Sequence, residues 1–361
     1  IYTLSLHDAL PIYELAAFRD GDPSVPFTID AETLRRFAPV LARAVPGFRK
    51  AAVPAEKRAF EVIDGTMNIG VRGLSFDALF SKNHGGLVSY RYGGKELLKG
   101  IVRPNFWRAP TDNDRGNRMP ERYAQWKIAS LYASHRDTED PAGDLEPRLT
   151  IEADAAVIRY LYRLPTRPTA CVEVEYRVFG EGTIETTLIY EPVPELGDMP
   201  EFGMIFKLDA DLDRVSWYGN GPAETYRDRK AGAKLGLYSN RVGENLAAYT
   251  IPGETGNKTD VRYAAVMRPN GEGLIFSSET FDGMEFSALP YSPHELENAG
   301  HDFELPPFHY TYVRAALGQM GIGGDDSWGA RTHPEYLLDA GAPMRFRFRF
   351  RGIERASALW T

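Results

Sequence analysis

From residue 59 onward, hydrophobic and polar residues alternate along many short runs of the chain. The clearest run is residues 344–350, MRFRFRF, in which apolar side chains and arginines take turns. Strict alternation with a period of two predicts a β-strand with one apolar face and one basic face. Similar alternation predicts strands at residues 60–63, 172–179, 183–190, 204–208 and 273–277.

Turn residues separate these runs. Examples are Gly93-Gly94, the Gly-Glu-Gly at residues 180–182 and the Pro-Asn-Gly at residues 269–271. Short strands joined by glycine- and proline-rich turns are typical of all-β sandwiches and barrels. Residues 119–132 predict one short helix. The pattern therefore favours an all-β fold with few short helices.

The first 58 residues differ from the rest of the chain in their pattern of apolar and polar residues. Residues 1–12, IYTLSLHDALPI, resemble the conceptual translation of a DNA-sequencing adapter. We interpret them as a sequencing-adapter artefact and exclude them from fold reasoning; the alternative is a genuine N-terminal strand. Residues 13–58 are interpreted as a remnant or linker. Within them, residues 31–45 have apolar residues at helical spacing that Pro39 interrupts.

Composition narrows the classes of protein that remain. The 361 residues carry a net charge of −8, which disfavours nucleic-acid binding because phosphate contacts need a basic surface. The chain contains no run of 18 apolar residues, so no membrane-spanning helix is predicted. The single cysteine, Cys171, excludes an internal disulfide framework and is predicted to be a buried strand residue. Together these features favour a cytoplasmic protein.

Four segments are richer in polar and aromatic residues than strand packing requires. Each mixes glycine or proline with carboxylates. Loops of this kind on a rigid sandwich are the usual place for function. The segments are residues 103–116 (RPNFWRAPTDNDRG), 217–229 (WYGNGPAETYRDR), 252–262 (PGETGNKTDVR) and 319–329 (QMGIGGDDSWG).

In order and spacing, these segments resemble the C-terminal domain of the β-galactosidases of glycoside hydrolase family 2, over roughly residues 59–352. The resemblance implies that residues 59–361 form a large β-sandwich (supersandwich) of the galactose-mutarotase type. It also implies that this domain packs against a catalytic (β/α)8 barrel. The third segment departs from the family, because a PQENG-like sequence is expected where this chain has PGETG. That departure leaves the detailed role of Glu254 open.

The resemblance also implies which residues contact the sugar. Trp328 is expected to stack on the galactoside, and a loop that begins at Gly116 is expected at the mouth of the site. An indole covers the apolar C–H face of galactose with little loss of rotamer entropy. Asp325 and Asp326 are expected to support the Trp328 loop by accepting backbone hydrogen bonds, and the nearby glycines to let it turn sharply. The alternative is that Trp328 is a core aromatic residue.

No catalytic residue is expected in this chain. Glycosidases need two carboxylates on either side of the scissile bond. The pairs Asp112 with Asp114 and Asp325 with Asp326 are more typical of turns and helix N-caps. In the resembled family both catalytic glutamates lie on the barrel. The Mg and Na ions that the family uses are likewise expected on missing domains, with no cofactor or metal in this chain.

Other polar residues have structural interpretations beside functional ones. A buried polar network is one interpretation of Arg108, Glu224, Tyr226, Asp228 and Arg229, and we favour Arg–carboxylate pairs that bridge loops. None of the seven histidines has zinc-site spacing. The pair His294 and Glu297 matches the acid–base needs of a mutarotase, although a surface pair is favoured. Core positions are predicted for Phe106 and Trp107, and turn positions for Asn105 and Asn113.

Three functions stay open at this point. The favoured one is a fragment or small subunit of a β-galactosidase, which hydrolyses terminal β-D-galactose residues, with this chain inactive by itself. Its partners are a β-galactoside substrate and a catalytic barrel in the same or another chain, with no nucleic acid and no membrane. The alternatives are a non-catalytic carbohydrate-binding module and a free aldose epimerase.

Overall fold

The strands of the computed structural model form three antiparallel sheets in the residues that it describes, 60–135, 147–280, 282–326 and 329–354. These residues belong to a compact unit that spans Ala59–Thr361. The interpretations of residues 1–12 and 13–58, including the helix at residues 31–45, lie outside the described residues and stay predictions.

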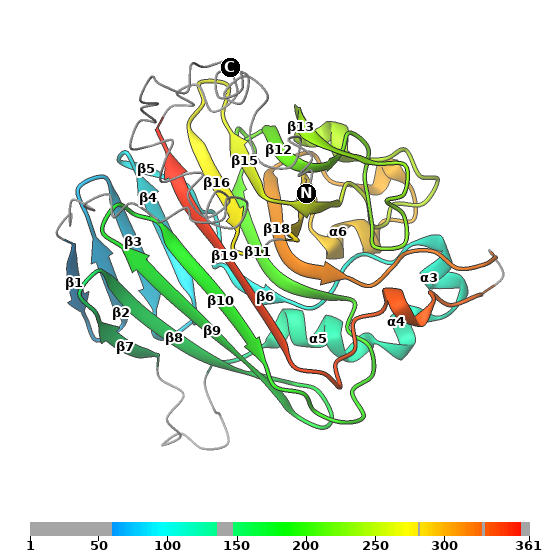
Figure 1. Cartoon of the computed structure of the whole chain (residues 1–361), viewed down its shortest axis with the longest axis horizontal. Helices are drawn as coiled ribbons and strands as arrows, with labels where there is room; N and C mark the ends of the chain where they lie inside the picture. The colour runs from blue at the N-terminus through cyan, green and yellow to red at the C-terminus, as the bar shows by residue number, and fades with distance from the viewer. Residues whose placement is uncertain (1–59, 136–146, 281, 327–328, 355–361) are drawn as a thin grey trace, which may run out of the picture. The chain divides into compact units, whose positions relative to one another are not determined.

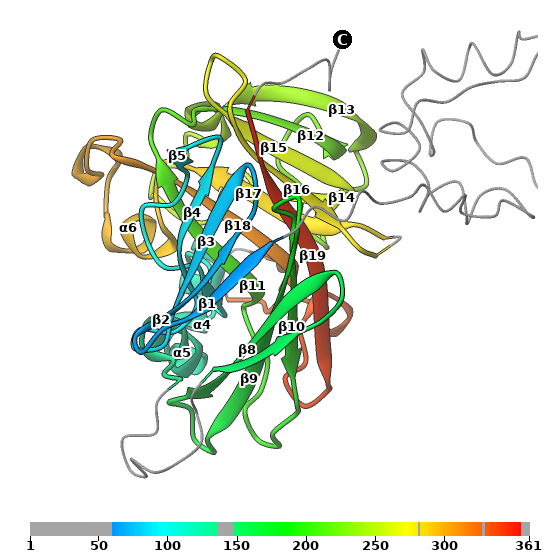
Figure 2. The ribbon, with the colours of Figure 1, turned by 90° about the vertical axis from the view of Figure 1, so that its left-hand side faces the viewer.

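The nine-stranded sheet forms one layer of the fold (Figures 1 and 2). Its strands, in spatial order, are β13 (Lys234–Arg241), β12 (Arg214–Gly221), β15 (Tyr263–Met267), β16 (Gly273–Ser278), β19 (Met344–Ile353), β10 (Ile184–Tyr190), β9 (Ala170–Phe179), β8 (Ala155–Leu164) and β7 (Arg148–Ile151).

Two five-stranded sheets pack against this layer. One contains β1 (Glu61–Asp64), β2 (Asn68–Arg72), β3 (Phe76–Ser81), β4 (Leu87–Tyr92) and β5 (Lys95–Glu96), in that order. The other, which we call the site sheet, has the order β14 (Lys258–Val261), β17 (Met284–Leu289), β18 (Tyr310–Gln319), β11 (Glu201–Asp209) and β6 (Arg103–Asn105).

Aromatic side chains join the layers. Phe206 of the site sheet meets Phe276 and Phe350 of the nine-stranded sheet edge to face, with ring centroids 5.1 Å apart in each pair. Tyr90 of β4 meets the same Phe350 at 5.7 Å. Edge-to-face pairs add to the stabilisation that aromatic burial supplies. Because both five-stranded sheets contact the same nine-stranded sheet, the fold is a β-sandwich. The prediction of an all-β fold with few short helices is confirmed.

The described residues also include short helices: α3 (Asp112–Gly116), α4 (Met119–Arg122), α5 (Ala124–Tyr132), α6 (Pro293–Asn298), and the 3-10 turns η2 (Val242–Asn245), η3 (Asp302–Glu304) and η4 (Pro334–Tyr336). Figure 1 shows α3, α4 and α6 on the right, on the opposite side from β1 to β3. Among the described residues, no helix combines the length and apolar character that crossing a membrane requires.

The alternating runs lie in strands as predicted, and β19 turns its arginines away from the core. Arg349 forms an ion pair with Glu185 of the neighbouring β10 at 2.7 Å. The prediction that Cys171 is a buried strand residue is wrong about burial: the residue lies in a strand, but on its exposed face. In β9, Val172 and Val174 point into the core, so the alternation places Cys171 on the exposed outer face.

The helix predicted at residues 119–132 is two helices. Arg118 adopts a left-handed backbone conformation (φ 61°) just before α4, and Tyr123 separates α4 from α5. Trp126 on α5 is buried in the core, and its ring lies 6.0 Å from that of Phe106. The inward face of α5 therefore anchors the segment that carries Gly116 to the sandwich.

Candidate functional site

The two faces of the site sheet have opposite chemistry. Phe206, Phe286 and Val313 point into the apolar core. On the other face, Glu285, Ser287 and Arg314 are polar and yet buried. Buried charges are stable only when they are paired and hydrogen-bonded. This face therefore needs a cover of loops that supplies partners, and the four segments provide it.

Arg314 of β18 lies at the centre of this polar face. Its Nη1 contacts Glu201 Oε2 at 2.6 Å, its Nη2 pairs with Glu254, and its Nε donates to Ser287 Oγ at 3.0 Å. Burial raises the pKa of Glu201 to about 7, against the opposing effect of Arg314. Asn105 Nδ2 donates to the other oxygen of Glu201 at 2.6 Å. The prediction that Asn105 is a turn residue is therefore wrong, because it is a buried strand residue of β6.

Side-chain amides extend this cluster to the third segment. Gln319 Nε2 donates to Glu254 Oε1 and to Asn257 Oδ1, both at 3.3 Å. Asn257 Nδ2 in turn donates to Glu285 Oε2 at 2.8 Å. Burial raises the pKa of Glu285 to about 7, more than Arg227 and Asn257 lower it. Glu254, whose role was open, is thus a buried partner of Arg314.

The first and fourth segments lie against each other. Arg108 is fully buried, pairs with Asp114 of α3, and donates through Nη2 to the carbonyl of Gly321 at 3.1 Å. A Cβ placed on Gly329 would lie 3.3 Å from the carbonyl oxygen of Gly116. Two of the segments predicted to contact a sugar therefore meet, and Arg108 connects their bases.

The second segment holds the fourth through a carboxylate. Asp228 Oδ2 accepts a hydrogen bond from the backbone N–H of Gly323 at 2.6 Å. Thr332 Oγ1 lies 3.1 Å from the carbonyl oxygen of Gly321. A Cβ on Gly321 would lie 2.7 Å from atoms of both Asp228 and Thr332, so the backbone approaches more closely than any side chain allows. Close approach, rather than a sharp turn, is the reason for glycine at position 321.

The five residues considered as one polar network divide into separate groups. Glu224 pairs with Arg229 and accepts a hydrogen bond from the backbone N–H of Gly256 at 2.7 Å. Asp228 contacts Gly323, whereas Arg108 pairs with Asp114. Arg108, Glu224 and Asp228 each reach another segment through a bond between a side chain and a backbone group. The Arg–carboxylate pairs predicted as bridges lie within single segments.

The candidate carboxylate pairs form structural bonds. Thr111 and Asp114 make a reciprocal capping box at the start of α3, as expected of N-cap residues. Asn113 lies inside α3, so its predicted turn position is wrong. Asp326 accepts a hydrogen bond from the backbone N–H of Ala330 at 3.2 Å, as expected of a loop support, whereas Asp325 contacts His333 at 2.9 Å.

Among the described residues, the direct contacts of Glu297 are to residues other than His294. Glu297 accepts a hydrogen bond from Trp107 Nε1 at 2.9 Å and pairs with Lys127 at 3.0 Å. His294 is held mostly out of water, and burial lowers its pKa. Both side chains are half-buried, and the charge of Glu297 opposes the lowering of the His294 pKa, so the two residues lie near each other while Glu297 also anchors Trp107. Both Phe106 and Trp107 are core residues, as predicted.

Trp328, with Ser327, lies outside the described residues, and its sugar contact stays a prediction. Over the part of the chain that the structure describes, no group of three or more His, Cys, Asp or Glu side chains is placed to hold a metal ion.

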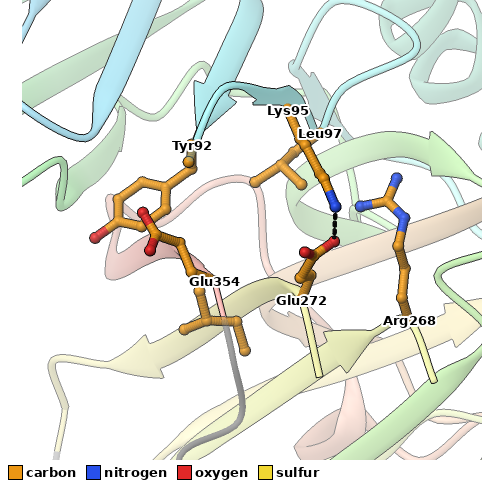
Figure 3. Close-up of a pocket in the computed structure, with 8 residues that line it drawn as sticks. Tyr92, Lys95, Leu97, Arg268, Glu272 and Glu354 are labelled. Atoms are coloured by element: carbon orange, nitrogen blue, oxygen red, sulfur yellow. Dashed lines mark hydrogen bonds and ion pairs between the residues drawn. The ribbon is translucent and has the colours of Figure 1, made fainter. Parts of the chain in front are cut away.

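Two cavities differ greatly in size. One, of about 20 Å³, lies between the β4–β5 hairpin and the β15–β16 hairpin, where Lys95 pairs with Glu272 (Figure 3). This volume suits about one water molecule and no sugar. The other has about 300 Å³ and lies beside the third segment, where Pro252 and Leu305 are among its lining residues.

A β-sandwich whose loops enclose a polar face is the class of protein that these observations define. Residues 72–350 match the family described as "Beta galactosidase small chain". The chain belongs to this family.

Three relatives have names that agree with this family. A β-galactosidase of Priestia megaterium is 40% identical over 294 residues, which cover 81% of this chain and 27% of the relative. One from Halalkalibacterium halodurans is 38% identical over 312 residues, which cover 83% and 29%. A β-galactosidase small subunit of Latilactobacillus sakei is 32% identical over 308 residues, which cover 80% of this chain and 96% of the relative. The chain thus spans less than a third of the first two relatives and nearly all of the third.

Solved structures similar to this chain include a galactose 1-epimerase from Lactobacillus acidophilus, with a TM-score of 0.45 and 9% identity over 82% of this chain and 98% of that one. A putative aldose 1-epimerase from Escherichia coli has a TM-score of 0.43 and 12% identity over 82% and 99%.

Proposed function

We propose that this chain is the small-chain part of a β-galactosidase and supplies one wall of the site that binds terminal β-D-galactose residues. The wall consists of Trp328 and the Gly116 loop, with Asp325 and Asp326 supporting the Trp328 loop. The catalytic glutamates of the enzyme belong to a (β/α)8 barrel outside this sequence, and its Mg and Na ions to domains outside this sequence. The chain alone does not hydrolyse galactosides.

The observation that carries this proposal is the contact between the first and fourth segments. Gly329, which directly follows Trp328, approaches the carbonyl of Gly116, and Asn117 Nδ2 lies 3.5 Å from the carbonyl oxygen of Ala330. Residues far apart in sequence therefore present one shared edge. A sugar ring bound at this edge would contact both segments.

The proposed inactivity of the isolated chain has its own support. Retaining glycosidases need two carboxyl groups about 5–5.5 Å apart, of which one acts as an acid and the other as a nucleophile. Asp114 is bound to Arg108 and to the α3 N-terminus, and Asp325 to His333. In the described residues, these candidates already serve the loops.

The test combines this chain with a barrel-bearing partner. The probe is the Priestia megaterium β-galactosidase from which the part matched by this chain has been removed. We expect neither protein alone to hydrolyse o-nitrophenyl β-galactoside, and the mixture to do so. Hydrolysis by this chain alone, or a mixture without activity, contradicts the proposal.

A substitution at Trp328 separates a sugar contact from mere folding. We expect Trp328→Ala to raise the KM of the active mixture about 10–100-fold, because an aromatic stacking partner is lost. Trp328→Phe keeps an aromatic face and should recover much of the loss. Equal KM values for the wild type and Trp328→Ala would leave a structural role for this residue and contradict the proposed contact.

A further inference from the structure

A groove lies beside the candidate site, between residues 246–255 and residues 291–308. Its volume is about 300 Å³, at the lower end of the range for ligand pockets. Its walls are mainly apolar, with Leu246, Pro252, Leu296, Leu305 and Phe308 among them. Polar groups that converge on one point, as a small polar ligand requires, are scarce among the lining residues.

The floor of this groove is a small hydrophobic cluster separate from the main core. Ala109, Leu289, Tyr291 and Leu296 form it, and Leu246 and Leu305 pack against it. A satellite cluster under loops gives a firm base, because its buried side chains hold both walls. The groove is therefore a shaped surface rather than a gap between loose loops.

Large apolar side chains are exposed at its rim, by which we mean the lining residue Phe308 and the sequence neighbours of the lining residues Asp302 and Pro252. Phe303 of η3 is 83% exposed, Phe308 is 54% exposed and Ile251 is 38% exposed. Isolated exposed apolar residues are ordinary on protein surfaces, but several beside one apolar groove are typical of an interaction site. Aromatic residues are also the side chains most enriched at the centre of protein interfaces.

The groove and the candidate site share a wall. Arg115 of α3 donates through Nη2 to the carbonyl of Pro252 at 2.9 Å. A Cβ on Gly253 would lie only 2.5 Å from the carbonyl oxygen of Pro110. A polypeptide seated in the groove would thus lie one loop away from Gly116, on the side of the chain where the sugar site is proposed.

We propose that this groove is a docking site for the polypeptide that carries the rest of the β-galactosidase, and that it receives apolar side chains of that polypeptide. The proposal rests on the proposed function. It commits to this occupant because the chain spans 27% of the Priestia megaterium relative and 96% of the Latilactobacillus sakei small subunit. The remaining polypeptide is fused in the one relative and absent from the other. A seat that serves both arrangements lies on residues that both relatives share with this chain, and the groove falls within the residues that match the family, 72–350.

The experiment measures binding of the shortened Priestia megaterium β-galactosidase by sedimentation velocity and titration calorimetry. The variants are Phe303→Asp and Phe308→Asp, which place a charge at the rim. The matched control is Leu74→Asp, because Leu74 is 81% exposed but lies between β2 and β3, far along the chain from the groove. We expect Kd to rise about 100-fold in the groove variants and to stay within about twofold in the control.

The outcomes separate the two proposals. Absence of binding by the wild-type chain contradicts the proposed function itself. Binding that is equally strong in the wild type and both groove variants overturns the docking site and leaves the proposed function standing. Self-association that the groove variants abolish, with binding of the shortened enzyme unchanged, assigns the groove to a second copy of this chain and also overturns the inference. Thermal unfolding of each variant verifies that a loss of binding is not a loss of folding.

Discussion

The two faces of the site sheet are both buried, but different interactions stabilise them. On the inner face, Phe206 and Phe286 bury apolar surface against the nine-stranded sheet, and packing alone stabilises them. On the outer face, Arg314 and Glu201 are equally buried, and so is Glu254 of the loop that covers them; each depends on a particular partner. The inner face tolerates any side chain of suitable size and shape, whereas the outer face tolerates few changes of charge.

This difference explains where function lies. A polar face that is covered by loops keeps those loops in one arrangement, because each buried polar group must meet its partner. Arg314, Glu254 and Gln319 tie the third segment to β18, and Arg108 ties the first segment to the fourth. The proposed sugar wall is therefore supported from beneath by buried charges as well as by the apolar packing of α5.

The strongest test of this comparison is Arg314→Met. It removes the cation between Glu201 and Glu254 and leaves two buried carboxylates without their charge partner. We expect a loss of about 3–5 kcal/mol in the free energy of unfolding, measured by urea denaturation at pH 7.

Two further variants make this result specific. Phe206→Ala on the inner face should cost a similar amount, about 3–5 kcal/mol, through the cavity that it leaves. Adding Glu254→Gln should recover stability in Arg314→Met and not in Phe206→Ala, because it removes a buried charge. A double variant no more stable than Arg314→Met alone would show that packing, not charge, explains the loss.

A second prediction uses the pKa of Glu285. Burial raises it from an ordinary 4.5 to about 7, so the folded state binds a proton that the unfolded state has released between these values. The contribution to stability is therefore fully present below pH 4.5 and is lost as the pH rises through 7. We expect this group to lower the free energy of unfolding by on the order of 3 kcal/mol across that range.

Glu285→Gln removes this titration and keeps an oxygen that accepts the hydrogen bond from Asn257. Urea denaturation of both proteins at pH 5 and pH 8 should show a smaller loss of stability in the variant. Part of the dependence on pH should remain, because the pKa of Glu201 is raised in the same direction. Parallel curves for the two proteins would refute the assignment to Glu285.

A third prediction concerns the carboxylate that holds the fourth segment. Asp228→Ala leaves the backbone N–H of Gly323 without its acceptor, and we expect a cost of about 1–3 kcal/mol. Hydrogen exchange of the Gly323 amide should also become faster. Asp228→Asn retains an oxygen at this place and serves as the matched control. If both variants exchange at the wild-type rate, the segment is held by Thr332 and Arg108 alone.

Alternation predicted the strands well because it depends on nearest neighbours along the chain. The runs at residues 172–179 and 344–350 lie within β9 and β19. Alternation does not reveal whether the polar face of such a strand is exposed to solvent or covered by loops. Glu201 and Arg314 look like solvent-facing residues of a half-buried strand, and only the loops that fold over them make them buried.

The contacts between segments could not be predicted from the sequence, for a related reason. Arg108 and Gly321 are 213 residues apart, and no local pattern pairs a side chain with a distant carbonyl. The resemblance of the motifs to a known family placed the segments in one domain, but it did not predict which atoms join them. Asn105 shows the limit, because an asparagine after a proline is typical of a turn, and its burial follows only from its partner Glu201.

The smallest expected effect tests the other layer, at two adjacent positions of β9. Cys171 is on the exposed face, so Cys171→Ser should change the free energy of unfolding by less than about 0.5 kcal/mol. Val172 is buried, and Val172→Ser should cost about 2 kcal/mol or more through lost apolar burial and a buried hydroxyl.

Reaction of the folded protein with a thiol reagent gives a second measurement. Although Cys171 reaches solvent, its partial burial raises the pKa of the thiol, so the reaction should be slow at pH 7 and faster at pH 9. Similar costs at the two positions would mean that the strand can shift its register by one residue. Such a shift would move every side chain of β9 to the opposite face, which its pairing with β8 and β10 opposes.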